Sequence, residues 1–319
     1  MWSKYFAFTF NTDQETFRGS TVYTMSNGDL IYTCISYGMN VFRLTSSGDT
    51  LWSKKIDAPG NTLSIGYSLS NNNNRILEDG NGGFFITGIM DGNLQQFYLF
   101  HLSSSGQVIF SNIIDIGTDY QYLDSYAQLA FLQDGSILLS GKKVTVGTET
   151  PFFLKLSAST GEVLAGFSPP SYSLLGDLSI YEVMPYQDKI LMAASTSTYG
   201  ALYTFSSNFQ LLDKAKVLAS RSGVFTGQFI KDATADNLYF DYDMPGPGGG
   251  DGFQFLKTQM NGKSCQDYTT PIDSLNFSSM TANSTSINMI TGDGYNYTTV
   301  PLIWTVNTIS FTGTPSCGR

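Results

Sequence analysis

The stretch Asn40–Lys55, NVFRLTSSGDTLWSKK, predicts a β-hairpin. An apolar strand, Val41–Leu44, leads into the polar turn Ser46–Asp49, and a return strand begins at Leu51. Gly48 is the residue that permits this turn, because glycine adopts a positive φ without steric cost.

The same hairpin pattern recurs along the chain, which indicates a repeat protein. Further copies are FYLFHLSSSGQVIFSN (Phe97–Asn112), FFLKLSASTGEVLAGF (Phe152–Phe167), ALYTFSSNFQLLDKAK (Ala201–Lys216) and FQFLKTQMNGKSCQDY (Phe253–Tyr268). Each is preceded by a second hairpin with a short polar turn. These five are TVYTMSNGDLIYTCIS (Thr21–Ser36), RILEDGNGGFFITGIM (Arg75–Met90), AQLAFLQDGSILLSGK (Ala127–Lys142), IYEVMPYQDKILMAAS (Ile180–Ser195) and FIKDATADNLYFDYDM (Phe229–Met244). A sixth, weaker copy is SSMTANSTSINMITGD (Ser278–Asp293).

Two hairpins per unit and a period of roughly 50 to 55 residues predict a six-bladed β-propeller of four-stranded antiparallel blades. The expected repeats are residues 1–50, 51–108, 109–163, 164–211, 212–263 and 264–319, and they form a single domain over residues 1–319. A jelly-roll or sandwich is the alternative all-β fold, but its strands do not repeat with one period.

The N-terminal strand is expected to close the ring, because Met1–Phe6 resembles the return strand Leu51–Ile56. Its expected partner is the segment around Leu302–Val306 in the last blade, a pairing that would leave no open sheet edge. The alternative is that Ile309–Phe311 is the last strand and the N-terminal strand is an additional edge.

Composition sets limits on the partners. The 26 acidic and 17 basic residues give a formal charge of -9, and no basic stripe follows the sequence, so nucleic acid is not an expected partner. The N-terminal segment lacks a long unbroken apolar run, so membrane insertion is not expected, and a secretory signal would lie outside this numbering.

Connections outside the tight turns are expected to be long and to carry any binding function. They are Ala58–Asn74, Gly117–Tyr126, Ser168–Asp177 and Met244–Gly252. Tyrosines in or beside these connections suit contacts with carbohydrate or protein, and the binding-face candidates are Tyr120, Tyr122, Tyr126 and Tyr172.

The repeat units resemble those of secreted β-propeller repeat proteins of Bacteroidota and ciliates. The resemblance is carried by Asn40–Lys55, Asp79–Ile89, Phe97–Asn112 and Asp134–Gly141. These units are also similar to pyrroloquinoline-quinone-type repeats, but the resemblance implies no cofactor here. It implies an extracellular or cell-surface propeller.

Catalytic chemistry that depends on histidine is not expected, because His101 is the only histidine. Since His101 occupies the same repeat position as Arg43 and Lys155, we expect a solvent-facing strand residue. Asp79–Gly83 has oxygen ligands near a turn but lacks the spacing of a known metal loop, so no metal site is expected. The carboxylates Asp241, Asp243 and Asp251 are the residues that an enzyme of this composition would use.

Cys34 lies in an apolar strand and is expected to be a buried small side chain, whereas Cys265 and Cys317 lie in polar surroundings that a disulfide could join. Three sequons near the C-terminus, at Asn276, Asn283 and Asn296, are glycosylation candidates for an exported eukaryotic protein.

These observations favour a non-catalytic module that acts as an adhesive or structural subunit or binds glycans, surface proteins or its own copies. The alternative hypothesis is a propeller enzyme, a glycan lyase or hydrolase, that uses carboxylates and tyrosines on the long-loop face.

Overall fold

The computed structural model describes residues 4–8, 20–35, 38–57, 62–64, 75–91, 96–117, 122–123, 128–145, 148–168, 179–195, 199–219, 229–231, 237–245, 251–259, 278–287, 290–293 and 297–301. These residues form antiparallel sheets joined by turns. No helix in these ranges is long and apolar enough to cross a membrane.

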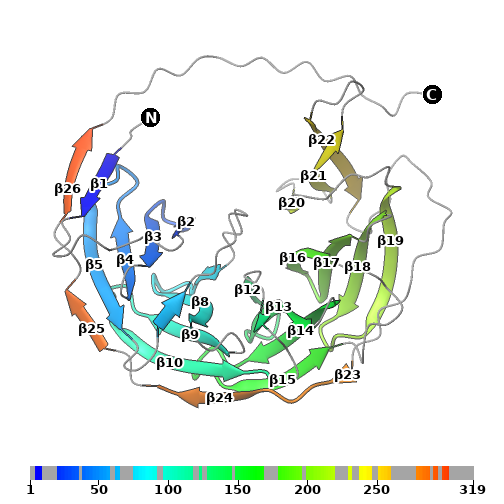
Figure 1. Ribbon diagram of the computed structural model, residues 1–319, viewed down its shortest axis with the longest axis horizontal. Coiled ribbons are helices and arrows are strands. Elements are labelled where there is room, and N and C mark those ends of the chain that lie inside the picture. The colour runs from blue at the N-terminus through cyan, green and yellow to red at the C-terminus, as the bar shows by residue number, and fades with distance from the viewer. Residues whose placement is uncertain are drawn as a thin grey trace.

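Four sheets contain four or more strands, and they follow one another in chain order around a common centre (Figure 1). Sheet 1 contains β2 (Ser20–Thr24), β3 (Leu30–Ile35), β4 (Met39–Leu44), β5 (Thr50–Asp57) and β25 (Ile290–Asp293). Sheet 2 contains β6 (Thr62–Ser64), β7 (Ile76–Glu78), β8 (Phe84–Asp91), β9 (Gln96–Leu102), β10 (Val108–Asp115) and β24 (Asn283–Ser286). Sheet 3 contains β11 (Tyr122–Leu123), β12 (Gln128–Phe131), β13 (Ile137–Thr145), β14 (Thr148–Leu156), β15 (Val163–Ser168) and β23 (Ser278–Ser279). Sheet 4 contains β16 (Ser179–Tyr186), β17 (Lys189–Ser195), β18 (Tyr199–Ser206) and β19 (Leu211–Ala219).

Two smaller sheets complete the described structure. Sheet 5 contains β20 (Phe229–Lys231), β21 (Asn237–Pro245) and β22 (Asp251–Gln259). The remaining pair is β1 (Lys4–Phe8) with β26 (Tyr297–Pro301). The prediction of an all-β fold of repeated antiparallel sheets is therefore confirmed, but the described residues do not form a closed ring of six four-stranded blades.

The stretch Asn40–Lys55 forms the predicted hairpin, which lies in sheet 1. Residues of β4 pair with β5, and the turn between them is closed by a hydrogen bond from Thr45 N to Asp49 O at 2.7 Å. Gly48 has the expected positive φ of 79°. Equivalent hairpins form in sheets 2, 3 and 4 between β9 and β10, β14 and β15, and β18 and β19.

Three hydrophobic clusters fill the spaces between successive sheets. In β9, Tyr98 and Phe100 pack in the cluster shared with sheet 1, whereas Phe97 and Leu99 pack in the cluster shared with sheet 3. A strand with buried side chains on both faces must be continuously apolar, which explains the run FYLF in the sequence.

The sixth predicted hairpin, residues 278–293, does not form. Instead, β23 pairs with β15, β24 pairs with β10, and β25 pairs with β5. Each of these short strands adds to the outer edge of a different sheet, so this part of the chain runs back along the rim from sheet 3 to sheet 1 (Figure 1). We call β23, β24 and β25 the strap.

The N-terminal strand pairs with a C-terminal strand, but not with the predicted one. Lys4–Phe8 lies antiparallel to Tyr297–Pro301, with Lys4 opposite Pro301 and Phe8 opposite Tyr297. The expected partner around residues 302–306 lies outside the described residues, as does the alternative strand at 309–311. Because β1 and β26 form a sheet of their own, this pairing does not complete a four-stranded blade.

Not all connections outside the tight turns are long, in contrast to the prediction. Connections between the second and third strand of each sheet are short: β13 ends at Thr145 and β14 begins at Thr148. The proposed loop Met244–Gly252 is shorter than predicted, because Met244 and Pro245 belong to β21, and Asp251 and Gly252 belong to β22. Long connections lie between sheets, as between β15 and β16, and also between β6 and β7 of sheet 2.

Candidate active site

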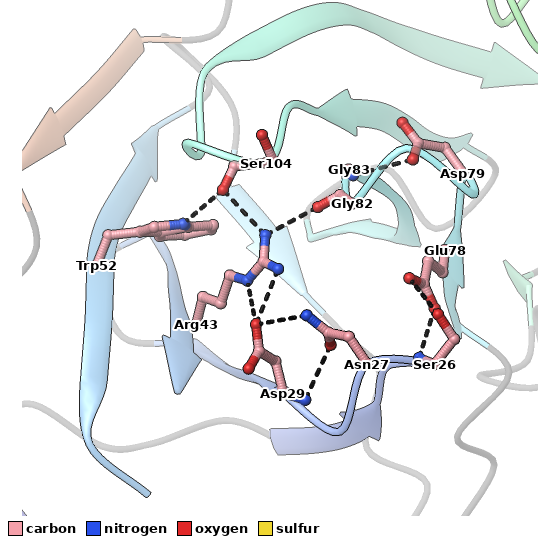
Figure 2. A network of polar contacts seen from close by, with 10 residues as sticks. All are labelled: Ser26, Asn27, Asp29, Arg43, Trp52, Glu78, Asp79, Gly82, Gly83 and Ser104. Carbon is pink, nitrogen blue, oxygen red and sulfur yellow. Dashed lines mark hydrogen bonds and ion pairs between the residues drawn. The ribbon is translucent and has the colours of Figure 1, made fainter. Parts of the chain in front are cut away.

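A polar network joins sheets 1 and 2 at their tight turns, and Arg43 lies at its centre (Figure 2). The guanidinium of Arg43 forms an ion pair with Asp29 at 2.8 Å, and its Nη1 donates to the carbonyl oxygens of Gly82 and Ser104 at 2.9 and 3.1 Å. The side chains of Arg43 and Asp29 are only 10% and 16% exposed. The planar guanidinium suits this position because it offers several donors in fixed directions.

Two further contacts cross the same boundary. The indole Nε1 of Trp52 donates to Ser104 O at 2.9 Å, and the Trp52 ring is stacked on Phe84 at 6.1 Å. On the neighbouring turn, the backbone N and the Oγ of Ser26 both donate to the carboxylate of Glu78, at 2.7 and 2.9 Å (Figure 2). The described carboxylates of this network are therefore occupied in holding turns together.

His101 is not the solvent-facing residue that its repeat position suggested. Its Nε2 lies 2.8 Å from Asp79 Oδ2, and its ring is stacked on Phe85 at 4.1 Å. The side chain is 12% exposed, because the turn that contains Asp79 folds over it. The other oxygen of Asp79 accepts hydrogen bonds from the backbone N of Asn81 and of Gly83, so this carboxylate closes the turn.

The equivalent residue in sheet 3, Lys155, binds Asp134. This contact, together with hydrogen bonds from Ser136, lowers the pKa of Asp134 from its ordinary value of 3.8 to about 2. Arg43, His101 and Lys155 thus each hold an aspartate of the turn beside them. The sequence placed these residues at one repeat position but did not show that each has an acidic partner.

The three carboxylates singled out in the sequence are close together on the β21–β22 hairpin. The ladder has no register shift, and it places Asp241 opposite Phe255, Asp243 opposite Phe253, and Asp251 opposite Pro245. Residues two apart on a strand, and residues opposite each other across a ladder, share one face of a sheet. Asp241, Asp243 and Asp251 therefore share one face of this hairpin, with Asp251 where β22 begins and Asp241 midway along β21.

Two phenylalanines were not among the predicted site residues, yet they share this face. Phe253 and Phe255 occupy the register positions opposite Asp243 and Asp241. The alternation of FQF after a carboxylate at Asp251 is the sequence signal that could have indicated them, since strand residues alternate between faces.

The other predicted site residues are not brought together with these carboxylates in the described structure. Tyr122 lies in β11, where it is opposite Val144, and Asn283 is an exposed residue of β24 opposite Asp115. The remaining candidates, Tyr120, Tyr126, Tyr172, Asn276, Asn296, Cys265 and Cys317, lie outside the described residues.

Cys34 is a free, fully buried thiol, as predicted. Burial raises its pKa to about 12. Among the described residues, no group of three or more His, Cys, Asp or Glu side chains could hold a metal ion.

No protein-family model matches the chain, and no curated protein matches it. Similar solved structures include a protein of unknown function from Bacteroides caccae, with 9% identity, a TM-score of 0.38 and coverage of 64% of this chain and 68% of that chain. A GH43 glycoside hydrolase with endo-xylanase and exo-arabinofuranosidase activity has 10% identity, a TM-score of 0.38 and coverage of 76% and 50%. The polysaccharide lyase Uly1 has 12% identity, a TM-score of 0.39 and coverage of 75% and 57%.

These neighbours correct one expectation. Two of the three are enzymes that act on glycans, which contradicts the prediction of a non-catalytic adhesive or structural module. The chain spans about half the length of these two enzymes. At this level of similarity neither the substrate nor the catalytic residues transfer, so the chemistry must be argued from the residues of this chain.

Proposed function

We propose that the protein is a glycan-degrading enzyme whose acid and base are carboxylates of the β21–β22 hairpin. The observation that carries this proposal is the unbroken ladder that places Asp241, Asp243 and Asp251 on one face. Glycoside hydrolysis needs a pair of carboxylates that flank the bond to be broken.

The register favours Asp243 and Asp251 as the pair. Asp251 is two register positions from Phe253, the residue opposite Asp243, so the two aspartates are diagonal neighbours. Diagonal positions of an antiparallel ladder are about 7–8 Å apart. This backbone spacing would let the two carboxyl groups reach the ~6.5–9.5 Å separation found in inverting glycosidases, which leaves room for a water molecule.

In this proposal one aspartate donates a proton to the glycosidic oxygen as the bond to the anomeric carbon breaks. The other accepts a proton from the water that attacks this carbon from the opposite side, so the product has inverted configuration. Asp241, the next carboxylate on the same face, contributes negative charge that favours the protonated form of the acid. Phe253 and Phe255 supply apolar area for a sugar ring.

We also infer that sheets 1 to 5 are blades of a β-propeller. The order of the sheets around one centre and the antiparallel meander within each sheet support this inference. Six blades and a ring that is closed by the N-terminal strand are part of this inference.

The test is turnover on a panel of neutral and anionic polysaccharides with the wild type, Asp243→Asn and Asp251→Asn. We expect each substitution to reduce turnover by roughly 10²-fold or more, as loss of a general acid or base does. Asp213→Asn is the matched control, because Asp213 is an exposed aspartate of β19 in another sheet. Full turnover by both variants, with folding verified by circular dichroism, would exclude these carboxylates.

The products separate the two reaction classes. A hydrolase releases a reducing end without a new double bond, and the anomer formed first, observed by NMR, is the inverted one. A lyase produces an unsaturated sugar that absorbs in the ultraviolet. Unsaturated products would assign the lyase reaction and would remove the water-activating role from the pair.

A further inference from the structure

The strap is attached to the outer edges of three sheets mainly through its backbone. In β24 the register runs from Asn283 opposite Asp115 to Ser286 opposite Asn112. Ser111 Oγ donates to Ile287 O at 2.6 Å, and Ile287 N donates to Ser111 O at 3.0 Å. Backbone pairing of this kind depends little on the identity of the side chains.

The side chains of the strap contribute little burial. Every residue from Ser278 to Ile287 is exposed or half-buried. Three of them, Met280, Ala282 and Ile287, pack at the margins of the cores between the sheets. By contrast, the strands below the strap contain fully buried residues, such as Ile114 in β10. The hydrophobic free energy of the fold is therefore concentrated in the sheets and not in the strap.

The attachment is also divided into short ladders. Two register pairs join β23 to β15, Phe167 with Ser279 and Ser168 with Ser278. Four join β24 to β10, and four join β25 to β5. Short ladders on separate sheets can open one at a time, and each opening exposes an unpaired strand edge that another strand can occupy.

We propose that the strap exchanges between two copies of this chain, so that β23–β25 of one copy pair with β15, β10 and β5 of the other. Because β26 begins only three residues after β25, it moves with the strap and pairs with β1 of the other copy. A second copy is the partner that fits these edges, because it presents the same strands with the same registers. Every contact made within one chain can then be made between two chains, which is the condition for domain swapping. This proposal is independent of the proposed catalytic activity.

Single cysteines on separate chains test the exchange. Ile113 of β10 lies opposite Thr285 of β24, and opposite residues of an antiparallel ladder have Cα atoms about 4.5–5.5 Å apart, within the range that a disulfide spans. Chains with Ile113→Cys are mixed at high concentration with chains with Thr285→Cys, incubated and oxidised. Because neither chain has both new thiols, an exchanged strap holds them next to each other, whereas without exchange they meet only by collision.

We expect severalfold more covalent dimer from this mixture than from Thr285→Cys mixed with Asp213→Cys, in which the exposed β19 thiol reports random collision. The dimer yield is expected to rise with protein concentration and incubation time. The parent chain, which has its own three cysteines, gives the background yield that is subtracted. The double variant Ile113→Cys/Thr285→Cys at low concentration is expected to form the bond within one chain.

Two results would overturn the proposal. The first is a double variant that closes within one chain, together with a mixture that yields no more dimer than the collision control, because the strap is then permanently held by its own chain. The second is a double variant that forms no bond, because the strap then does not lie along β10.

Discussion

The Nη1 atom of Arg43 lies 2.9 Å from the carbonyl oxygen of Gly82, so a side chain of sheet 1 closes a turn of sheet 2. The same guanidinium is paired with Asp29 of its own sheet. One cation therefore compensates a mostly buried carboxylate and also satisfies backbone acceptors across the boundary between the sheets.

Replacement of Arg43 by alanine is expected to lower the free energy of unfolding by about 3 kcal/mol, because Asp29 is left without its buried partner. Arg43→Lys should lower the free energy of unfolding less, because lysine keeps the positive charge beside Asp29. Some loss remains, because an ammonium group cannot reach all three acceptors at once. Chemical denaturation measures both changes. Lys189→Ala, at an exposed residue where β17 begins, is the control; an equal effect of Lys189→Ala and Arg43→Ala would show that the network adds no stability.

The Asp134–Lys155 pair predicts a small dependence of stability on acid pH. The pKa of Asp134 is lowered to about 2 in the folded protein, from 3.8. The folded state therefore binds the proton less tightly than the unfolded state, so the contribution is complete above pH 4 and is lost as the pH falls toward 2. Since Asp134 is 52% exposed, solvent screening limits the contribution to less than about 1 kcal/mol.

Thermal unfolding of wild type and Asp134→Asn between pH 5 and pH 2 measures this contribution. The difference in Tm between the two proteins should be largest at pH 5 and should shrink toward pH 2. Added salt should reduce the difference at pH 5. A difference that grows on acidification would mean that the pair does not exist in solution.

Two glycines with positive φ should respond differently to alanine. Gly135 has a φ of 79°, and a Cβ added there would have no other atom within 4 Å, so Gly135→Ala should cost only the backbone strain, about 1–2 kcal/mol. At Gly161, with a φ of 70°, an added Cβ would clash with the ring of Phe110. Gly161→Ala should therefore cost about 1–3 kcal/mol more than Gly135→Ala, as overpacking does.

Chemical denaturation of the two variants under one condition gives this comparison. Because both glycines lie in tight turns with a similar φ, the difference between the variants isolates the contact with Phe110. Equal losses would show that the turn of sheet 3 is not held against β10.

Local hairpins could be predicted from the sequence because the residues of each turn and its two strands are adjacent in the chain. Gly48 marks a turn, and the apolar residues on both sides of it mark strands. The role of Arg43 and His101 could not be predicted in this way, since alternation along a strand does not show that a neighbouring turn covers an outward residue. The shared face of Asp243 and Asp251 was not predicted either, because it depends on the register between β21 and β22.

The strap shows a second limit. Its strands are rich in Ser, Thr and Asn and have no apolar stripe, so they resemble a weak repeat copy in the sequence. Their partners are edge strands more than 100 residues away, as in the hydrogen bond between Ser111 and Ile287. Pairing through the backbone leaves no pattern of side chains from which the partner strand could be identified.

Phe209 predicts how one repeat tolerates the loss of a turn glycine. It occupies the position of Gly48 in the hairpin of sheet 4, with a φ of 61°, and its ring is stacked on Phe167 at 4.5 Å and on Phe153 at 5.3 Å. Phe209→Gly should relieve about 1–2 kcal/mol of backbone strain. It should also remove a side chain that is 2% exposed, which destabilises the fold by about 3–5 kcal/mol.

The net result should be a loss of stability of about 1–4 kcal/mol, measured by chemical denaturation, although glycine is the residue that the turn itself prefers. Phe209→Asn is the matched variant, because asparagine tolerates this backbone conformation but cannot replace the ring. A variant Phe209→Gly as stable as wild type would mean that the ring contributes nothing beyond its own strain. A loss of stability in both variants would show that the ring of Phe209 joins sheets 3 and 4. At the equivalent position between sheets 1 and 2, Gly106 lies against Trp52.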